Sequence, residues 1–83
     1  MITYEPFYKT LKEKNISTYK LITQYNVSTS LLNRIKHNKN ISTMTLNDLC
    51  NILDCRVEDI ILFVKDEESD RKKQYQKEVD DLR

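Results

Sequence analysis

Glycine is absent from this 83-residue sequence, and proline and histidine occur once each, as Pro6 and His37. Loops that cradle nucleotide phosphates need glycine so that the backbone can approach the phosphate oxygens, so loops of this kind are excluded. A single imidazole leaves no second histidine for a histidine-rich metal site or a proton relay. We therefore predict that the chain is not an enzyme and that it uses no cofactor and no metal.

Long apolar runs are missing too. None approaches the roughly 20 residues that span a bilayer, and the segment Met1–Glu5 has neither the basic nor the apolar part of a secretory signal. In a chain of this kind the two cysteines, Cys50 and Cys55, are predicted to be small buried side chains and not a disulfide or zinc site. We expect a cytoplasmic protein without a membrane partner.

The charge is unevenly distributed, although the net formal charge is only +1. Residues 1–47 hold seven Lys and Arg against two acidic residues, 7 − 2 = +5. Residues 48–83 hold seven against eleven, 7 − 11 = −4. A basic half suits the approach of a polyanion, while an acidic half points elsewhere. Small domains also become lopsided by chance, so charge alone does not decide the partner.

Helical periodicity predicts five helices, at about residues 6–15, 18–25, 29–37, 43–53 and 57–60. Pro6 suits a first helical turn, Ser17 and Ser28 suit N-caps, and Asn26 suits the left-handed position that ends a helix. Either Ser42 or Thr43 caps the fourth helix. The predicted inward positions are Phe7, Leu11, Leu21, Ile22, Tyr25, Ser28, Leu31, Leu32, Ile35, Leu46, Leu49, Cys50, Leu53 and Val57.

Two segments of the chain leave alternatives open. Residues 61–64 are rich in β-branched and aromatic side chains, so they either pair as a strand with residues 2–4 or continue the helix. We place a domain boundary at residue 65, before a charged tail of residues 66–83. Tyr75, Val79 and Leu82 in that tail form a narrow stripe that suits a partner helix, and a solvated or disordered tail is the alternative.

Two short helices joined by a tight turn, with a polar outer face on the second, predict a helix-turn-helix. Residues 17–36 (STYKLITQYNVSTSLLNRIK) and 45–60 (TLNDLCNILDCRVEDI) resemble the phage Cro/C1-type (XRE) helix-turn-helix family, over roughly residues 5–64. The resemblance implies an all-α, five-helix, lambda-repressor-like DNA-binding domain. It also implies a sequence-specific transcriptional regulator, of bacterial or phage origin, whose partner is double-stranded DNA.

In that family the third helix lies in the major groove, and its first residues reach base edges. The resemblance thus implies base contacts by Thr29, Ser30, Asn33 and Arg34, of which Arg34 suits guanine and Asn33 suits adenine. Around them it implies phosphate contacts by a larger polar set: Thr18, Ser28, Lys36, His37, Asn38, Lys39, Asn40 and Thr43.

The sequence departs from the family at four positions. Thr18 stands where a longer glutamine is usual, so its reach toward a phosphate is shorter. Ile22 replaces a small residue, and Asn26 replaces the turn glycine, which it can do because asparagine tolerates positive φ. Leu31 occupies a position that is often polar, so it lies either in the core or against DNA.

A single small module buries too little surface for high specificity, which favours a homodimer on an inverted-repeat operator. We predict a repressor whose dimer contact lies within residues 57–82. The alternative is a protein-binding helix-turn-helix, such as an antitoxin or a mobile-element inhibitor. Steep salt dependence of binding favours DNA, because each phosphate contact releases counterions.

Overall fold

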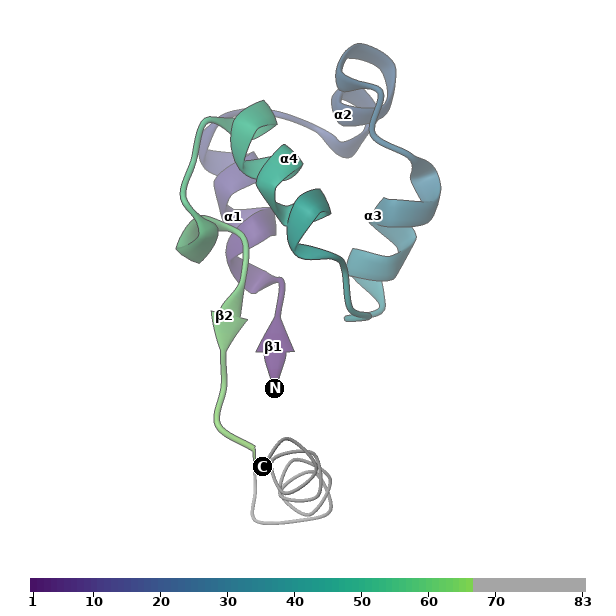
Figure 1. The fold of residues 1–83 in the computed structure, drawn as a ribbon. Helices are drawn as coiled ribbons and strands as arrows, with labels where there is room; N and C mark the ends of the chain where they lie inside the picture. Colours follow the sequence, from purple (N-terminus) through teal and green to yellow (C-terminus); the bar gives the residue numbers. More distant parts are fainter. Residues whose placement is uncertain (67–83) are drawn as a thin grey trace.

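The computed structural model describes residues 1–66. Their elements are β1 (Ile2–Thr3), α1 (Glu5–Glu13), α2 (Thr18–Tyr25), α3 (Thr29–Lys36), α4 (Thr43–Leu53), the 3-10 turn η1 (Val57–Asp59) and β2 (Leu62–Phe63). In Figure 1, α2 and α3 lie on one side, α1 and α4 on the other, and the two strands below. No helix in residues 1–66 is long and apolar enough to cross a membrane.

The predicted tail, residues 66–83, lies outside the described residues except for Asp66. This includes its stripe of Tyr75, Val79 and Leu82. The boundary at residue 65 and the state of the tail therefore stay predictions.

Serine side chains start three of the helices. The Ser17 hydroxyl accepts a hydrogen bond from the backbone N–H of Lys20 at 3.0 Å, and Ser28 accepts one from Leu31 at 3.1 Å. Ser42 accepts one from Thr45 at 3.0 Å. Caps of this kind stabilise a helix by about 1 kcal/mol each. The predictions for Ser17 and Ser28 are confirmed, and Ser42 is the cap of α4.

Asparagine and aspartate take the place of glycine where the backbone turns left-handed. Among the described residues the positive φ angles are 56° at Asn15, 58° at Asn26, 55° at Asn38 and 48° at Asp54. Their short polar side chains make this region less costly than it is for other residues with a Cβ. Asn26 ends α2 and Asp54 ends α4. The predicted role of Asn26 is therefore confirmed.

One apolar core joins the helices. Its buried members are Tyr4, Phe7, Leu11, Leu21, Val27, Ile35, Leu49, Leu53 and Ile60. Burying a side chain of this size contributes about 1.5–3 kcal/mol. The predicted inward positions of α1, α3 and α4 lie in this core or pack against it, except Ser28, which is exposed.

Two further predicted core residues are wrong. Tyr25 is 39% exposed and Val57 is 48% exposed. Tyr25 is the last residue of α2 and lines a groove beside α4. Val57 opens η1, and Ile60, which follows η1, occupies the core instead.

Within residues 61–64, Leu62–Phe63 form a strand, so the strand alternative is the correct one. β1 and β2 are antiparallel, with Ile2 opposite Phe63 and Thr3 opposite Leu62. The preceding fifth helix is only a single 3-10 turn, so residues 1–66 contain four α-helices and the predicted count of five is not confirmed. The Thr10 hydroxyl donates to the Asp59 carbonyl at 2.7 Å, fixing this turn against α1 before the chain extends toward β1.

Cys50 and Cys55 are free thiols, both partly buried and packed against the core. Burial, with smaller contributions from Cys50 and Asp59, raises the pKa of the Cys55 thiol from its ordinary value of 9.0 to about 11. A thiol that stays protonated is a poor nucleophile and a poor metal ligand. The prediction of small buried side chains is close to what is observed.

Replacing Asn26 by alanine keeps the Cβ but removes the polar side chain that favours positive φ. We expect the free energy of unfolding to fall by about 1 kcal/mol, measured by urea denaturation. Asn51→Ala is the matched control, because Asn51 is an exposed position of α4, where alanine favours the helix. Equal losses in the two variants would contradict a special role for the left-handed turn.

The raised pKa of Cys55 predicts a loss of stability in alkali. A thiol with a higher pKa in the folded chain contributes stability below its ordinary pKa and loses it as the pH rises from 9.0 to about 11. We expect the unfolding free energy of the wild type to fall more steeply across this window than that of Cys55→Ala, in reducing buffer. Burial also raises the pKa of Tyr4, but Tyr4 is present in both proteins, so their difference reports on Cys55. Parallel curves would rule out the effect.

Candidate nucleic-acid interface

The relative orientation of α2 and α3 is fixed by the turn between them. The Val27 N–H donates to the Leu21 carbonyl at 3.0 Å, and the Val27 side chain is buried. On either side of the turn, Leu21 of α2 and Ile35 of α3 are buried as well. Because one face of α3 is held in the core, its opposite face is exposed.

All the predicted base-contacting residues lie on that exposed face: Thr29, Ser30, Asn33 and Arg34. They border two different grooves. Thr29 and Asn33 border an α1-side groove of about 330 Å³, whose lining is Tyr8, Thr18, Ile22, Thr29, Leu32, Asn33 and Lys36. Ser30 and Arg34 border an α4-side groove of about 440 Å³, whose lining is Ser28, Ser30, Leu31, Arg34, Asn40, Ile41, Ser42 and Thr45. The outer face of α3 is thus a ridge between two hollows.

The predicted phosphate contacts are all exposed as well: Thr18, Ser28, Lys36, His37, Asn38, Lys39, Asn40 and Thr43. Thr18 and Lys36 belong to the α1-side groove, and Ser28 and Asn40 to the α4-side groove. The other four line neither groove. His37 Nδ1 lies 2.9 Å from the Asn33 carbonyl, so this ring folds back on the end of α3. Leu31 lines the α4-side groove and packs against the core.

Arg34 is the predicted base contact with three of its five N–H groups already engaged. Its Nε and Nη2 donate to the Asn40 carbonyl at 3.0 and 2.7 Å. Nη2 also donates to the Asn40 side-chain oxygen at 2.7 Å. The guanidinium is therefore hydrogen-bonded to the loop of residues 37–42, which joins α3 to α4.

Tyr4, near the N-terminus of the chain, also binds this loop. Its ring is buried, and its hydroxyl donates to the Lys39 carbonyl at 2.6 Å. Burial raises the pKa of this phenol, while the Arg34 charge and the Ile41 backbone lower it. The guanidinium, the phenol and the loop thus form one cluster.

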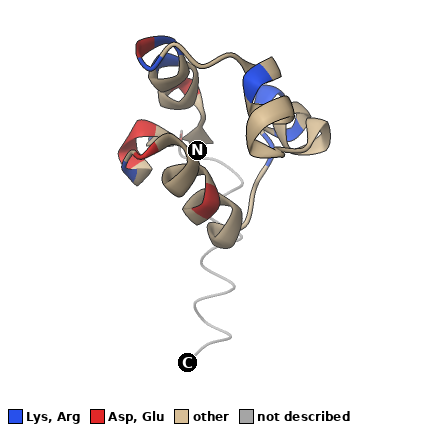
Figure 2. Ribbon diagram, turned by 90° about the horizontal axis from the view of Figure 1, so that it is seen from above, with Lys and Arg blue, Asp and Glu red and all other residues tan. Residues whose placement is uncertain are grey.

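Charge separates across the described part of the chain. Between Glu13 and Asp48 there is no acidic residue, while Lys14, Lys20, Arg34, Lys36 and Lys39 lie in this stretch. In Figure 2 the α2–α3 side carries blue and no red, and the red lies on α1, α4 and η1. The face that presents α3 is therefore the one that suits a polyanion.

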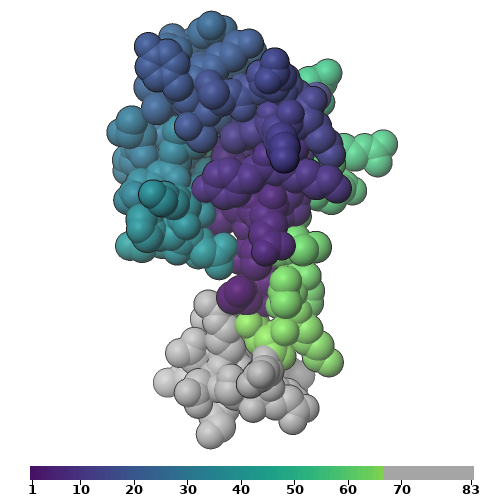
Figure 3. Space-filling view, turned by 180° about the vertical axis from the view of Figure 1, so that it is seen from behind, coloured from purple at the N-terminus to yellow at the C-terminus, as the bar shows by residue number. Residues whose placement is uncertain are grey.

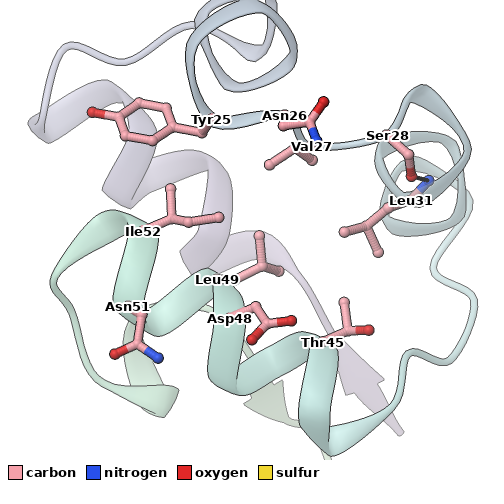
Figure 4. A pocket seen from close by; sticks show the side chains of 10 residues that line it. All are labelled: Tyr25, Asn26, Val27, Ser28, Leu31, Thr45, Asp48, Leu49, Asn51 and Ile52. Carbon is pink, nitrogen blue, oxygen red and sulfur yellow. Dashed lines mark hydrogen bonds between the residues drawn. The ribbon is translucent and has the colours of Figure 1, made fainter.

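A further hollow of about 500 Å³ lies between the α2–α3 turn and α4, with an apolar floor that includes Val27, Leu49 and Ile52 (Figure 4). Asp48 is its acidic lining residue. Within residues 1–66, no group of three or more His, Cys, Asp or Glu side chains is placed to hold a metal.

Sequence reasoning missed two residues at this interface. Tyr8 lines the α1-side groove beside Thr18 and is 44% exposed. Tyr4 reaches the loop after α3, 35 residues away in the chain. Neither position carries a local signal, because both contacts arise from the packing of α1 against the rest of the domain.

Comparison with known proteins agrees with this geometry. A family model described as the Cro/C1-type helix-turn-helix DNA-binding domain matches residues 8–66. The crystal structure of the transcriptional regulator VanUg, Form II, is similar with a TM-score of 0.70 and 26% sequence identity, covering 78% of this chain and 87% of that chain. No curated protein matches the sequence.

Proposed function

The chain belongs to the Cro/C1-type helix-turn-helix DNA-binding domain family, and we propose that it is a repressor that binds a specific double-stranded operator through α3. The observation that carries the proposal is the exposed polar face of α3, set within a stretch of the chain that has basic but no acidic residues. Where an operator overlaps a promoter, the bound protein excludes the polymerase, so repression needs no additional surface.

In the proposed complex α3 enters the major groove, which admits a helix of this diameter. The ridge of Thr29, Ser30 and Asn33 faces the base edges, with Arg34 beside it. The two grooves that flank the ridge then face the two sugar-phosphate backbones. Thr18 and Lys36 contact the phosphates of one backbone, and Ser28, Asn40 and Thr43 contact those of the other. The remaining predicted phosphate contacts lie at the end of α3 and just after it: His37, Asn38 and Lys39.

The proposed assembly is a homodimer, because two half-sites supply the specificity that one small module lacks. The two strands project below the helices, with the N-terminal and C-terminal parts of the domain side by side (Figure 3). Their apolar side chains remain outside: Ile2 and Leu62 are each 45% exposed and Phe63 is 65% exposed. A second copy covering this ribbon removes that surface from water and agrees with a dimer contact within residues 57–82.

The proposal predicts a defined operator. Selection from random duplex DNA by the purified chain is expected to enrich an inverted repeat with half-sites about one helical turn, roughly 34 Å, apart. Asn33→Ala is expected to relax the preference at one base pair of each half-site and to weaken binding there by about ten-fold. Binding should also weaken steeply with salt.

Asn51→Ala is the matched control, because it makes the same substitution on the exposed face of α4. It is expected to leave the enriched sequence unchanged. Failure of the wild type to enrich any sequence would sink the proposal. Salt-insensitive binding to another protein would then favour the protein-binding alternative.

The dimer contact predicts that a charge on the strand ribbon separates the protomers. Phe63→Lys places an ammonium group where the second copy packs, so the mass in sedimentation equilibrium is expected to fall from dimer to monomer. Met44→Lys is the control, because Met44 is also exposed, at 68%, but lies on α4. A wild type that sediments as a monomer, or a dimer that survives Phe63→Lys, would refute this interface.

A further inference from the structure

We propose that Arg34 and Tyr4 are positioning residues that hold the loop of residues 37–42 in its DNA-contacting shape, and that Arg34 does not read a base. This inference rests on the proposed function and changes one predicted role within it. Base readout then falls to the uncharged side chains of α3. Affinity depends on a loop that is held from two sides.

The hydrogen bonds of Arg34 leave no edge of the guanidinium free for a two-pronged contact. A guanidinium has five N–H groups, one on Nε and two on each Nη. Nε is bonded to the Asn40 carbonyl, and Nη2 is bonded to the Asn40 carbonyl and side-chain oxygens. Only the two N–H groups of Nη1 remain. Reading guanine O6 and N7 together takes two neighbouring nitrogens, so Arg34 would first have to give up at least one of its bonds to Asn40.

The ends of the loop are tied to the helices by the bonds of His37 and Ser42, and Ile41 packs against the core, so Lys39 and Asn40 are the part that Tyr4 and Arg34 hold. Asn38 adopts positive φ, and the Lys39 N–H donates to the Arg34 carbonyl at 2.8 Å as the chain leaves α3. Beyond this point, Tyr4 holds the Lys39 carbonyl and Arg34 holds the Asn40 carbonyl. The side chains of Lys39 and Asn40 are exposed, as phosphate contacts require. The carbonyl groups of two successive residues are thus held, while the Lys39 side chain is exposed and the Asn40 side chain bonds to Arg34 through its oxygen.

Positioning and base reading predict different patterns of loss. Phosphate contacts fix the protein on the duplex and carry no direct sequence information, whereas base contacts discriminate at one position. Loss of a positioning residue therefore weakens binding to all sequences alike. Tyr4 sharpens this distinction because its side chain is only 5% exposed and cannot itself touch DNA.

The test uses the full chain, the selected operator and the set of its single base-pair substitutions. Arg34→Ala and Tyr4→Phe are each expected to weaken binding to every duplex in the set by a similar factor, about ten-fold for Arg34→Ala and about five-fold for Tyr4→Phe. The order of preference among the duplexes is expected to stay as in the wild type. The double variant should lose less than the product of the two single losses, because both residues act on one loop.

Two substitutions serve as matched controls. Tyr25→Phe removes a phenol hydroxyl at the end of α2, and Arg56→Ala removes a guanidinium before η1. Both are expected to bind like the wild type. Thermal unfolding of every variant shows that binding is measured on folded protein.

Amide hydrogen exchange without DNA supplies a second readout. The Lys39 amide is expected to exchange faster in both Arg34→Ala and Tyr4→Phe than in the wild type, while the amide of Leu49 in the core stays protected. Unchanged exchange of the Lys39 amide in these variants would overturn the positioning role, whatever the DNA result.

Relaxed preference at one base pair in the Arg34→Ala protein, with Tyr4→Phe binding like the wild type, would establish Arg34 as a base reader and overturn the inference. A wild type that enriches no sequence defeats the proposed function itself, and with it any DNA role for the loop. Normal selection by the wild type with unaltered binding by both variants defeats the inference alone.

Discussion

The left-handed turn at Asn26 is the constraint on which the DNA-binding face depends. It stops α2, brings the Val27 N–H to the Leu21 carbonyl and turns the chain directly into the Ser28 cap of α3. The buried side chains on either side of this turn then fix how α3 sits on the core. Since α3 has eight residues, holding one face in the core exposes its other face along its whole length. A change in the turn angle would tilt every side chain on that face together.

Local chemistry explains which parts of the fold could be predicted from the sequence. The serine caps and the Asn26 terminator act within a few residues, so their effects can be inferred without knowledge of the fold, and the structure confirms them. The sequence of residues 61–64 suits both a strand and a helix. The strand forms by pairing with Ile2 and Thr3, which lie next to it in space but about 60 residues away in the sequence. The predicted fifth helix is not confirmed for a similar reason: residues 57–59 form a single 3-10 turn, and the contacts of this turn, such as the bond from Thr10 to the Asp59 carbonyl, reach residues far away in the sequence.

The candidate site also has a part that the sequence predicts and a part that depends on the packing of the helices. That the outer face of α3 is polar and exposed follows from helical periodicity, so its members could be named in advance. Their distribution between two grooves, with Asn33 on one side and Arg34 on the other, depends on how α1 and α4 pack beside α3. The bonds from Arg34 to Asn40 and from Tyr4 to Lys39 join segments that no sequence period relates. The sequence shows that Arg34 carries a guanidinium that is able to bind guanine, but the residues around it in the fold decide what it binds.

The proposed role of Arg34 changes how specificity arises on this surface. A stretch without acidic residues attracts any nucleic acid, so the basic side chains contribute affinity and little discrimination. With Arg34 held by the loop, base readout rests on Thr29, Ser30 and Asn33, of which only Asn33 can form a two-pronged base contact. One half-site then supplies modest discrimination, because a good contact pair is worth about 1–3 kcal/mol. In the proposed homodimer two half-sites multiply that discrimination, so under this proposal the exposed strand ribbon matters to sequence recognition as well as α3.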